Sequence, residues 1–551
     1  HDRYRRQRQM CIRDRQFASG STRFGDTQDD LHEFTGSLMV SGARISFTNG
    51  KTGTFIGLRA GSGTGIQNVA IGDDAMASTT DGFSNTAVGN SAMATGNVGN
   101  SNTGIGGQSL VDVTGNNNTA VGFQSGFNLT SAVGTTAIGY RSIYNGTATG
   151  DYNTALGAFS GFALTSGEEN VLIGREAGVT LTTTSNTIII GAHAGYALNS
   201  TDANGSVLVG HRAGLAITSG IGNIAIGSGS LSKEDDGDFN TAIGYQALTD
   251  QTGTSGTVAN TALGYKAGKS VLTGIYNTYL GYQSGMNASG SAADTNTGVG
   301  YRTLEALTSG SRNTSLGGFS ALQFQNASDI VALGHYTLAN ANTSTDIDGG
   351  VAIGSFSQAE MKTGQGNVSV GFRALQADVH GDFSTAIGHQ ALRDQTGVSG
   401  TVGNTAVGYR AGYEVTSGKE DTFIGYNSGL NTTEGKHNTA VGSQAFTTNV
   451  DGDHNTVVGY AALYNFEAGS DGQGYNTAIG SNAAFHLDSG QYNTMVGYAA
   501  GQSTSGTITY AGNTGLGYQA LYSITTGGYN VAVGNSAGDG VTTGGSNILL
   551  G

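Results

Sequence analysis

A short pattern of polar, apolar and small residues recurs along almost the whole chain, and Asn240-Thr-Ala-Ile-Gly244-Tyr-Gln-Ala-Leu248 is a typical copy. Each copy has an aliphatic residue directly before a Gly, and each copy that extends far enough has a small residue three positions after that Gly, followed in most copies by Leu or Gly. The chain contains 29 copies, and 18 of the 28 spacings between their glycines are 17 residues. A fixed period of this size predicts a solenoid in which each unit forms one rung.

Positions in each unit are numbered here from the repeat glycine, which is position 0. Position −1 is Ile, Val or Leu in all 29 copies, and position −3 is always Thr, Val or Ile. Because alternate residues of a strand share one face, the two columns point the same way. Their stiff, apolar side chains predict that this face forms the core. The predicted core column includes Ile71, Val88, Ile138, Ile243, Leu263, Ile387, Val407 and Ile479.

Position −2 lies on the opposite face, is small in most copies and never carries a charge. Some copies have a large residue there, among them Tyr279, Phe423 and Met495. A strand that is apolar on both faces needs cover on both. We therefore expect these three side chains to pack against another copy of the chain. The alternative is that small residues at position −2 merely suit a tight coil.

The repeat predicts an all-β fold, a parallel β-solenoid of the β-helix or β-roll type with about 29 rungs and a period of about 17 residues. It is expected to fill residues 51–551 as one elongated domain and to assemble as a homotrimeric fibre. The chain has no Pro, which fits a ladder that uses every backbone N–H. At about 4.8 Å per rung, the stack would be roughly 130 Å long.

The first 50 residues differ from the repeat. The run Arg8-Gln-Met-Cys-Ile-Arg-Asp-Arg15 resembles translated sequencing-adaptor sequence. We interpret residues 1–15 as an artefactual or disordered tail; the alternative is a basic arm for nucleic acid. Residues 16–50 are expected to form an N-terminal β segment or linker with two short strands, because side chains alternate in Ser37–Val40 and Ala43–Phe47.

Two features resemble the shafts of bacteriophage tail fibres. Phe24-Gly-Asp, followed by His32-Glu-Phe-Thr-Gly-Ser-Leu-Met-Val-Ser-Gly42, resembles the segment that leads into such a shaft. The Asn-Thr-Ala-Ile-Gly repeat is similar to repeats of phage and prophage tail fibres, and more weakly to the head repeats of trimeric autotransporter adhesins. The resemblance implies a structural shaft in the virion tail, outside the cell, that presents a receptor-binding tip to a host-surface glycan or protein.

Two other functions stay open. One is a bacterial surface adhesin or extracellular filament. The other is a polysaccharide-degrading tailspike, which needs two carboxylates about 5–10 Å apart; no pair stands out, and we expect no enzymatic activity and no cofactor. The net charge of −15 argues against nucleic acid as a partner. No apolar stretch approaches 18 residues, so we expect no membrane insertion.

Two sets of side chains are candidates for binding. Alternating acids could hold Ca²⁺, but the glycine-rich pattern of calcium β-rolls and the EF-hand loop are absent, and solvated loops are the alternative. The acids are Asp346, Asp348, Asp451 and Asp453. Tyr follows the repeat glycine in ten units and could contact glycans or stack on itself. These tyrosines include Tyr245, Tyr265, Tyr282, Tyr301 and Tyr409.

A long block of the chain occurs twice. Residues 237–268 recur almost unchanged at 381–412, an offset of 144 residues or eight units. This indicates growth by duplication of whole rungs. The longer loops Thr249–Ala259, Ala339–Gly349 and Arg393–Gly403 are the places within the repeat where binding specificity is most expected.

Overall fold

The structure is a computed structural model, and it describes residues 53–57, 60–61, 65–78, 81–95, 97–252, 256–289, 293–340, 347–396, 399–468, 472–504 and 507–551. The chain divides into two compact units, His1–Gly53 and Thr54–Gly551. The expected tail (1–15) and N-terminal β segment (16–50) lie outside the described residues. The account below concerns the second unit.

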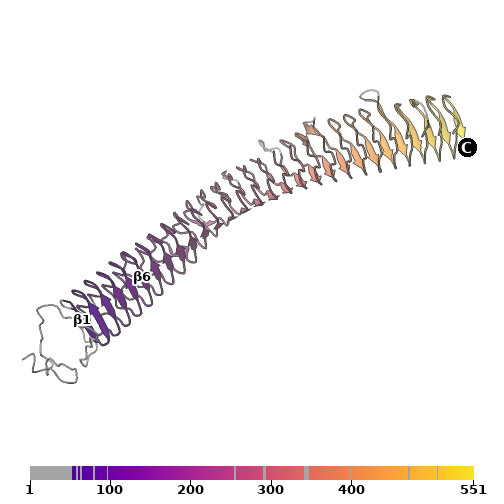
Figure 1. The fold of residues 1–551 in the computed structure, drawn as a ribbon. Helices are drawn as coiled ribbons and strands as arrows, with labels where there is room; N and C mark the ends of the chain where they lie inside the picture. The colour runs from indigo at the N-terminus through magenta and orange to yellow at the C-terminus, as the bar shows by residue number, and fades with distance from the viewer. Residues whose placement is uncertain are drawn as a thin grey trace, which may run out of the picture. The chain divides into compact units, whose positions relative to one another are not determined.

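This unit is a coil of parallel strands in which each repeat contributes one strand to a single 29-stranded sheet (Figure 1). Strand β13 (Thr241–Ile243) pairs with β15 (Thr261–Leu263) through the partners Thr241↔Thr261, Ala242↔Ala262 and Ile243↔Leu263. The other rungs pair in the same register, so that equivalent positions form straight columns. The predicted all-β parallel solenoid with a period of about 17 residues is confirmed.

The strands of the main sheet occupy positions −3 to −1 of their units, with one extra residue at the start of each of the first two. They are β1 (Gly53–Ile56), β2 (Asn68–Ile71), β3 (Thr86–Val88), β4 (Thr103–Ile105), β5 (Thr119–Val121), β6 (Thr136–Ile138), β7 (Thr154–Leu156), β8 (Val171–Ile173), β9 (Ile188–Ile190), β10 (Val207–Val209), β11 (Ile224–Ile226), β13, β15, β16 (Thr278–Leu280), β17 (Thr297–Val299), β18 (Thr314–Leu316), β19 (Val331–Leu333), β20 (Val351–Ile353), β21 (Val368–Val370), β23 (Thr385–Ile387), β25 (Thr405–Val407), β26 (Thr422–Ile424), β27 (Thr439–Val441), β28 (Thr456–Val458), β29 (Thr477–Ile479), β30 (Thr494–Val496), β31 (Thr514–Leu516), β32 (Val531–Val533) and β33 (Ile548–Leu550).

Two small additional sheets occur in the duplicated block. They pair β12 (Gly237–Asp238) with β14 (Gly256–Thr257), and β22 (Gly381–Asp382) with β24 (Gly400–Thr401). Within the described residues, the helical structure is one short 3₁₀ turn, η1 (Thr201–Ala203).

The repeat glycine is required by both its backbone angle and its neighbour in the next rung. Gly244 has φ 134°, and a Cβ there would lie 2.3 Å from the carbonyl oxygen of Gly264. Only glycine fits such a position. The turn that follows contains left-handed residues at positions +2 and +4, as at Gln246 (φ 54°) and Leu248 (φ 47°). The strand therefore ends at the glycine, and the chain turns back to cover it.

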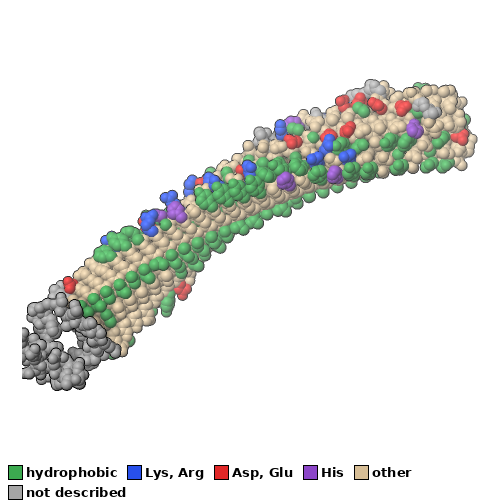
Figure 2. Space-filling model, viewed as in Figure 1, with side chains coloured by type: hydrophobic (Ala, Val, Ile, Leu, Met, Phe, Trp, Pro, Cys, Tyr) green, Lys and Arg blue, Asp and Glu red, His purple; other side chains and the backbone are tan. Residues whose placement is uncertain are grey.

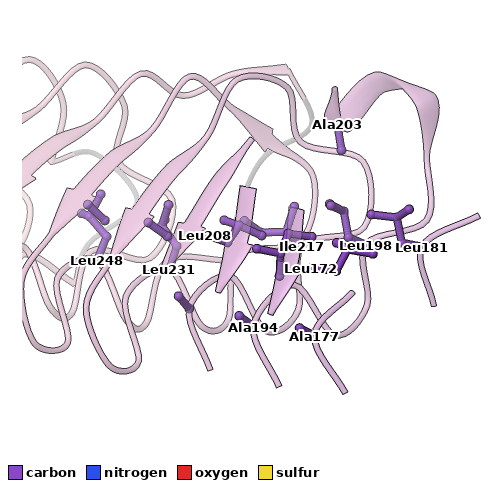
Figure 3. Close-up of a cluster of buried hydrophobic side chains, with 14 of the residues drawn as sticks. Leu172, Ala177, Leu181, Ala194, Leu198, Ala203, Leu208, Ile217, Leu231 and Leu248 are labelled. Carbon is purple, nitrogen blue, oxygen red and sulfur yellow. The ribbon is translucent and has the colours of Figure 1, made fainter. Parts of the chain in front are cut away.

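The core lies on the face opposite to the one predicted. Position −2 points inward, and Ala242 there has an exposed fraction of 0%. Small residues at position +3 and larger ones at +4 and +7 come from the turn and loop to meet it. Figure 3 shows this packing for Leu172 and Leu208 (position −2), Ala177 and Ala194 (+3), Leu231 and Leu248 (+4), and Leu181, Leu198 and Ile217 (+7).

The predicted core column is therefore wrong. Its members lie on the outer face of this chain: Ile71, Leu263, Ile387 and Ile479 are 36–43% exposed, and Val88, Ile138, Ile243 and Val407 are partly exposed. The physical reason is the narrow interior. It is already filled by side chains from the turn, so the strand contributes mostly Ala to it.

The predicted inter-chain residues are wrong for the same reason. Tyr279, Phe423 and Met495 are completely buried inside their own chain. A glycine at position +4 makes room for each of them: a Cβ on Gly285 would lie 2.3 Å from the Tyr279 ring, and one on Gly429 would lie 2.2 Å from the Phe423 ring. The side chains at positions −2 and +4 thus fill the same interior space, so that a large residue at −2 requires a glycine at +4.

Candidate functional site

The most extended surface feature is an aliphatic stripe, defined here as the position −1 residues from Ile56 to Leu550 together with the Thr, Val and Ile residues at position −3. Both columns project from the outer face of the sheet, because they alternate with the buried position −2. Leu156 and Leu316 are 43% and 49% exposed. Hydrophobic side chains form unbroken lines along the surface in Figure 2.

The stripe has the character of a contact surface. Neither of its columns contains a charged residue in any of the 29 copies. Soluble monomers rarely expose contiguous apolar patches larger than a few hundred Å². Covering the exposed two-fifths of an aliphatic side chain with a partner contributes roughly 1 kcal/mol to the free energy of association. The same contribution recurs on every rung. A partner with the same rise per rung could cover the whole stripe.

The asparagine at position −4 forms a buried polar column. In a typical rung, the Oδ1 atom of Asn240 accepts the backbone N–H of Asn260 at 3.1 Å. The Nδ2 atom of Asn260 donates to the carbonyl oxygen of Gly274 at 2.7 Å. Neighbouring amides also bond directly in places, as Asn170 does to Asn153 at 3.0 Å. The column satisfies backbone groups inside the coil.

Asp421 replaces asparagine in this column. Its Oδ1 accepts the N–H of Asn438 at 2.8 Å, as an asparagine would, but its Oδ2 is buried without a hydrogen-bond partner. Burial raises the pKa of Asp421 well above its ordinary value, and the acids Asp453 and Glu420 raise it further. The neutral carboxylic acid is the form that imitates asparagine, because its O–H can donate.

Two related carboxyl groups occur three residues before the additional strands β12 and β22. Asp378 accepts the N–H of Gly381 at 2.9 Å and the side-chain amide of Gln395 at 2.9 Å. Burial raises the pKa of Asp378 from 3.8 to about 7, against the lowering effect of these hydrogen bonds. Burial likewise raises the pKa of Glu234, which occupies the equivalent position in the first block.

These carboxyl groups give the fold a pH dependence of defined sign. The folded pKa of Asp378 is about 7 and exceeds its ordinary value of 3.8, so the folded state binds more protons than the unfolded state between these pH values. The contribution of Asp378 to stability is therefore fully present below about pH 4 and is lost as the pH rises to about 7. At pH 8 we expect Asp421→Asn to stabilise the surrounding rungs by about 1–3 kcal/mol, because its amide can donate where the carboxylate cannot.

Hydrogen exchange of peptides covering residues 404–438, measured at pH 5 and pH 8, tests this expectation. Wild-type protection should decrease from the acidic to the alkaline pH after correction for intrinsic exchange, whereas Asp421→Asn should remove much of that decrease. Asp202→Asn, at an exposed acid, is the control. Equal pH dependence in wild type and Asp421→Asn would contradict a protonated Asp421.

The candidate tyrosines form a ladder on the surface. The rings of Tyr245, Tyr265, Tyr282 and Tyr301 stack with centroid separations of 5.5, 5.0 and 5.2 Å, and Tyr409 stacks on Tyr426 at 5.3 Å. Their side chains remain 39–52% exposed. Because ring faces within the ladder cover each other, a sugar has only the ring edges and hydroxyl groups to contact. The structure places Tyr245, Tyr265, Tyr282 and Tyr301 in one self-stacked column and pairs Tyr409 with Tyr426.

Two of the candidate calcium ligands accept hydrogen bonds from the backbone of a neighbouring rung. Asp348 accepts the backbone N–H of Ser328 at 2.6 Å, and Asp453 accepts that of Lys436 at 2.7 Å. Asp451 is partly exposed, and Asp346 lies outside the described residues. The described part of the chain contains no cluster of three or more His, Cys, Asp or Glu side chains that could hold a metal ion.

Comparisons with known proteins do not assign the chain to a family. No protein-family model matches the chain, and no curated protein matches it. Among the described residues, no helix has the length and apolar character needed to cross a membrane.

Proposed function

We propose that the chain is the structural shaft of a phage tail fibre that holds a receptor-binding tip for host attachment. The observation that carries the proposal is the unbroken 29-stranded sheet, in which each rung pairs only with its neighbours in one register. Such a stack sets a distance, since whole rungs can be added without disturbing the others. The 144-residue duplication is consistent with this kind of growth.

The proposal includes self-association, with three copies as the expected number. The aliphatic stripe supports it, because a second copy of the chain has the same rise per rung and can match the stripe rung by rung. Tyr279 and its equivalents play no part in the contact, because they are buried in their own chain. The distal partner would be a glycan or protein on the host surface.

Immunogold electron microscopy tests the location. Antibodies raised against the purified chain are expected to label the tail fibres of virions that carry this gene, along a segment of constant length. Inserting a second copy of residues 237–380, which comprises eight units, should lengthen that segment by about 40 Å at about 4.8 Å per rung.

The same experiment separates the tail fibre from the surface adhesin. Gold on the surface of bacterial cells and none on virions would contradict the tail-fibre proposal and favour the surface adhesin.

An insertion of half a unit is the matched control for the eight-unit insertion, because it breaks the register of the sheet and should prevent assembly of the fibre.

A further inference from the structure

A polar pocket of about 350 Å³ lies on the solenoid wall where the second copy of the duplicated block begins. Three successive rungs form it. Thr363 and Gln365 come from the first rung, His380 and Asp382 from the second, and Ser399 from the third, and two glycines complete the lining. Strands β22 and β24 pair beside it, with Gly381 opposite Gly400 and Asp382 opposite Thr401. Ser399 belongs to the longer loop Arg393–Gly403 that the sequence marks as a candidate for binding.

The side chains of the pocket are held in place by neighbouring rungs. The Oγ1 atom of Thr363 lies 2.7 Å from Nδ1 of His380, so that Nε2 is the ring nitrogen left for a ligand. The Oδ1 atom of Asp382 accepts the backbone N–H of Gln365 at 2.9 Å. Its second carboxylate oxygen can still accept from a hydroxyl group. Gln365 and Ser399 add an amide and a hydroxyl, each able to donate and accept.

An exposed aromatic side chain lies next to the pocket in the chain. Phe383 follows Asp382, is 54% exposed, and packs over Gly366, where a Cβ would lie 2.9 Å from its ring. The pocket itself is lined by hydroxyl, amide, imidazole and carboxylate groups, which suit a ligand with several hydroxyl groups.

The first copy of the block provides an internal comparison. It has the same additional strand pair, with Gly237 opposite Gly256 and Asp238 opposite Thr257. At an offset of 144 residues, however, Gln365 corresponds to Ile221 and His380 to Asp236. The two regions therefore share the additional strand pair but differ at two of the side chains that line the pocket.

We propose that the pocket of the second block binds one neutral hexose or N-acetylhexosamine unit of a surface polysaccharide. The volume fits a single sugar ring, and its lining offers hydrogen-bond partners for several hydroxyl groups. Asp382 disfavours acidic sugars, because no Lys or Arg is among the described lining residues. This gives the wall of the solenoid a binding site of its own, independent of any tip and of whether the chain is a tail-fibre shaft.

Saturation-transfer NMR of the full chain tests the site. The probes are glucose, galactose, mannose, N-acetylglucosamine and N-acetylgalactosamine, each at millimolar concentration, because a single small ligand in an open pocket binds with roughly millimolar affinity. At least one sugar should receive saturation. The variant Gln365→Ile/His380→Asp, which introduces the side chains of the first block, should bind that sugar about tenfold more weakly.

Two further variants make the outcome decisive. Ile221→Gln/Asp236→His in the first block should add a second site, and Tyr245→Ala in the aromatic ladder should change nothing. Circular dichroism checks that each variant keeps its β structure. The proposal is overturned if no probe receives saturation, if Gln365→Ile/His380→Asp binds as wild type does, or if Tyr245→Ala abolishes the signal. The immunogold experiment does not depend on any of these results.

Discussion

Tyr279→Ala should destabilise the rungs around β16 by about 3–5 kcal/mol, because it leaves a cavity in a closely packed interior. The Tyr279 side chain is fully buried and is among the largest such side chains in the core. Because each rung contacts mainly its neighbours, we expect faster hydrogen exchange in peptides from residues 260–317 and little change farther away. Tyr245→Ala, on the exposed ladder, is the control and should cost less than about 1 kcal/mol.

A second substitution should restore much of this loss. Gly285→Leu alone should also destabilise the fold, since a Cβ at residue 285 would lie 2.3 Å from the Tyr279 ring. In Tyr279→Ala/Gly285→Leu, the leucine can occupy the vacated volume, as Leu248 does beside Ala242. The backbone allows it, because Gly285 (φ 59°) and Leu248 (φ 47°) are both left-handed. If the double variant lost as much stability as the two single variants together, residues 279 and 285 would not fill the same interior space.

Three charges on the aliphatic stripe should dissociate the proposed oligomer without unfolding the chain. Leu263→Asp, Ile387→Asp and Ile479→Asp together place carboxylates on side chains that are 37–43% exposed in the single chain. In a free chain these carboxylates remain hydrated, so the fold should lose little stability. In an assembled fibre each would be buried without a partner, at a cost of several kcal/mol. Light scattering should show a shift to lower mass at unchanged circular dichroism.

A variant with the same added charge controls for net repulsion. Gln246→Asp, Gln283→Asp and Gln519→Asp change position +2, which lies outside the stripe and already has a left-handed backbone that aspartate tolerates. This variant should keep the wild-type mass. If both triple variants dissociated equally, long-range charge and not the stripe would be responsible. If the stripe variant unfolded instead, the position −1 column would belong to the core after all.

The period and the columns of the fold could be predicted from the sequence, but the inward face could not be read from hydrophobicity. The uniform Ile, Val and Leu of position −1 suggested a core, and the Ala of position −2 suggested a surface. In this narrow coil the reverse holds, because the turn fills the interior with residues such as Leu248 and Leu181. When a strand is apolar on both faces, its hydrophobic pattern does not show which face points inward. Shifting the assignment by one residue moves every side chain to the opposite face.

A correlation within the sequence contained the missing information. Where position −2 is large, as at Leu208 or Phe423, position +4 is glycine, and where position −2 is Gly298, position +4 is Leu304. Such compensation is expected of residues that touch across an interior and not of residues on opposite sides of a strand. Asp421 is detectable in the sequence as well, as the one acid in a column that is mostly asparagine.

Other features depend on three-dimensional detail. The pocket at Gln365 and His380 requires three rungs in register, and the sequence alone points only to the loop that contributes Ser399. The left-handed backbone of non-glycine residues such as Leu248 has no sequence signal of its own. It follows from the stacking of successive turns.

The mass of the full chain in solution tests the central claim most directly. One chain has a mass of 55.7 kDa, and sedimentation equilibrium at micromolar concentration should give three times that value for the wild type. The variant with Asp at residues 263, 387 and 479 should sediment as a single chain. A wild-type protein that remained a folded monomer, with its aliphatic stripe open to water, would contradict the proposal of a self-associated fibre.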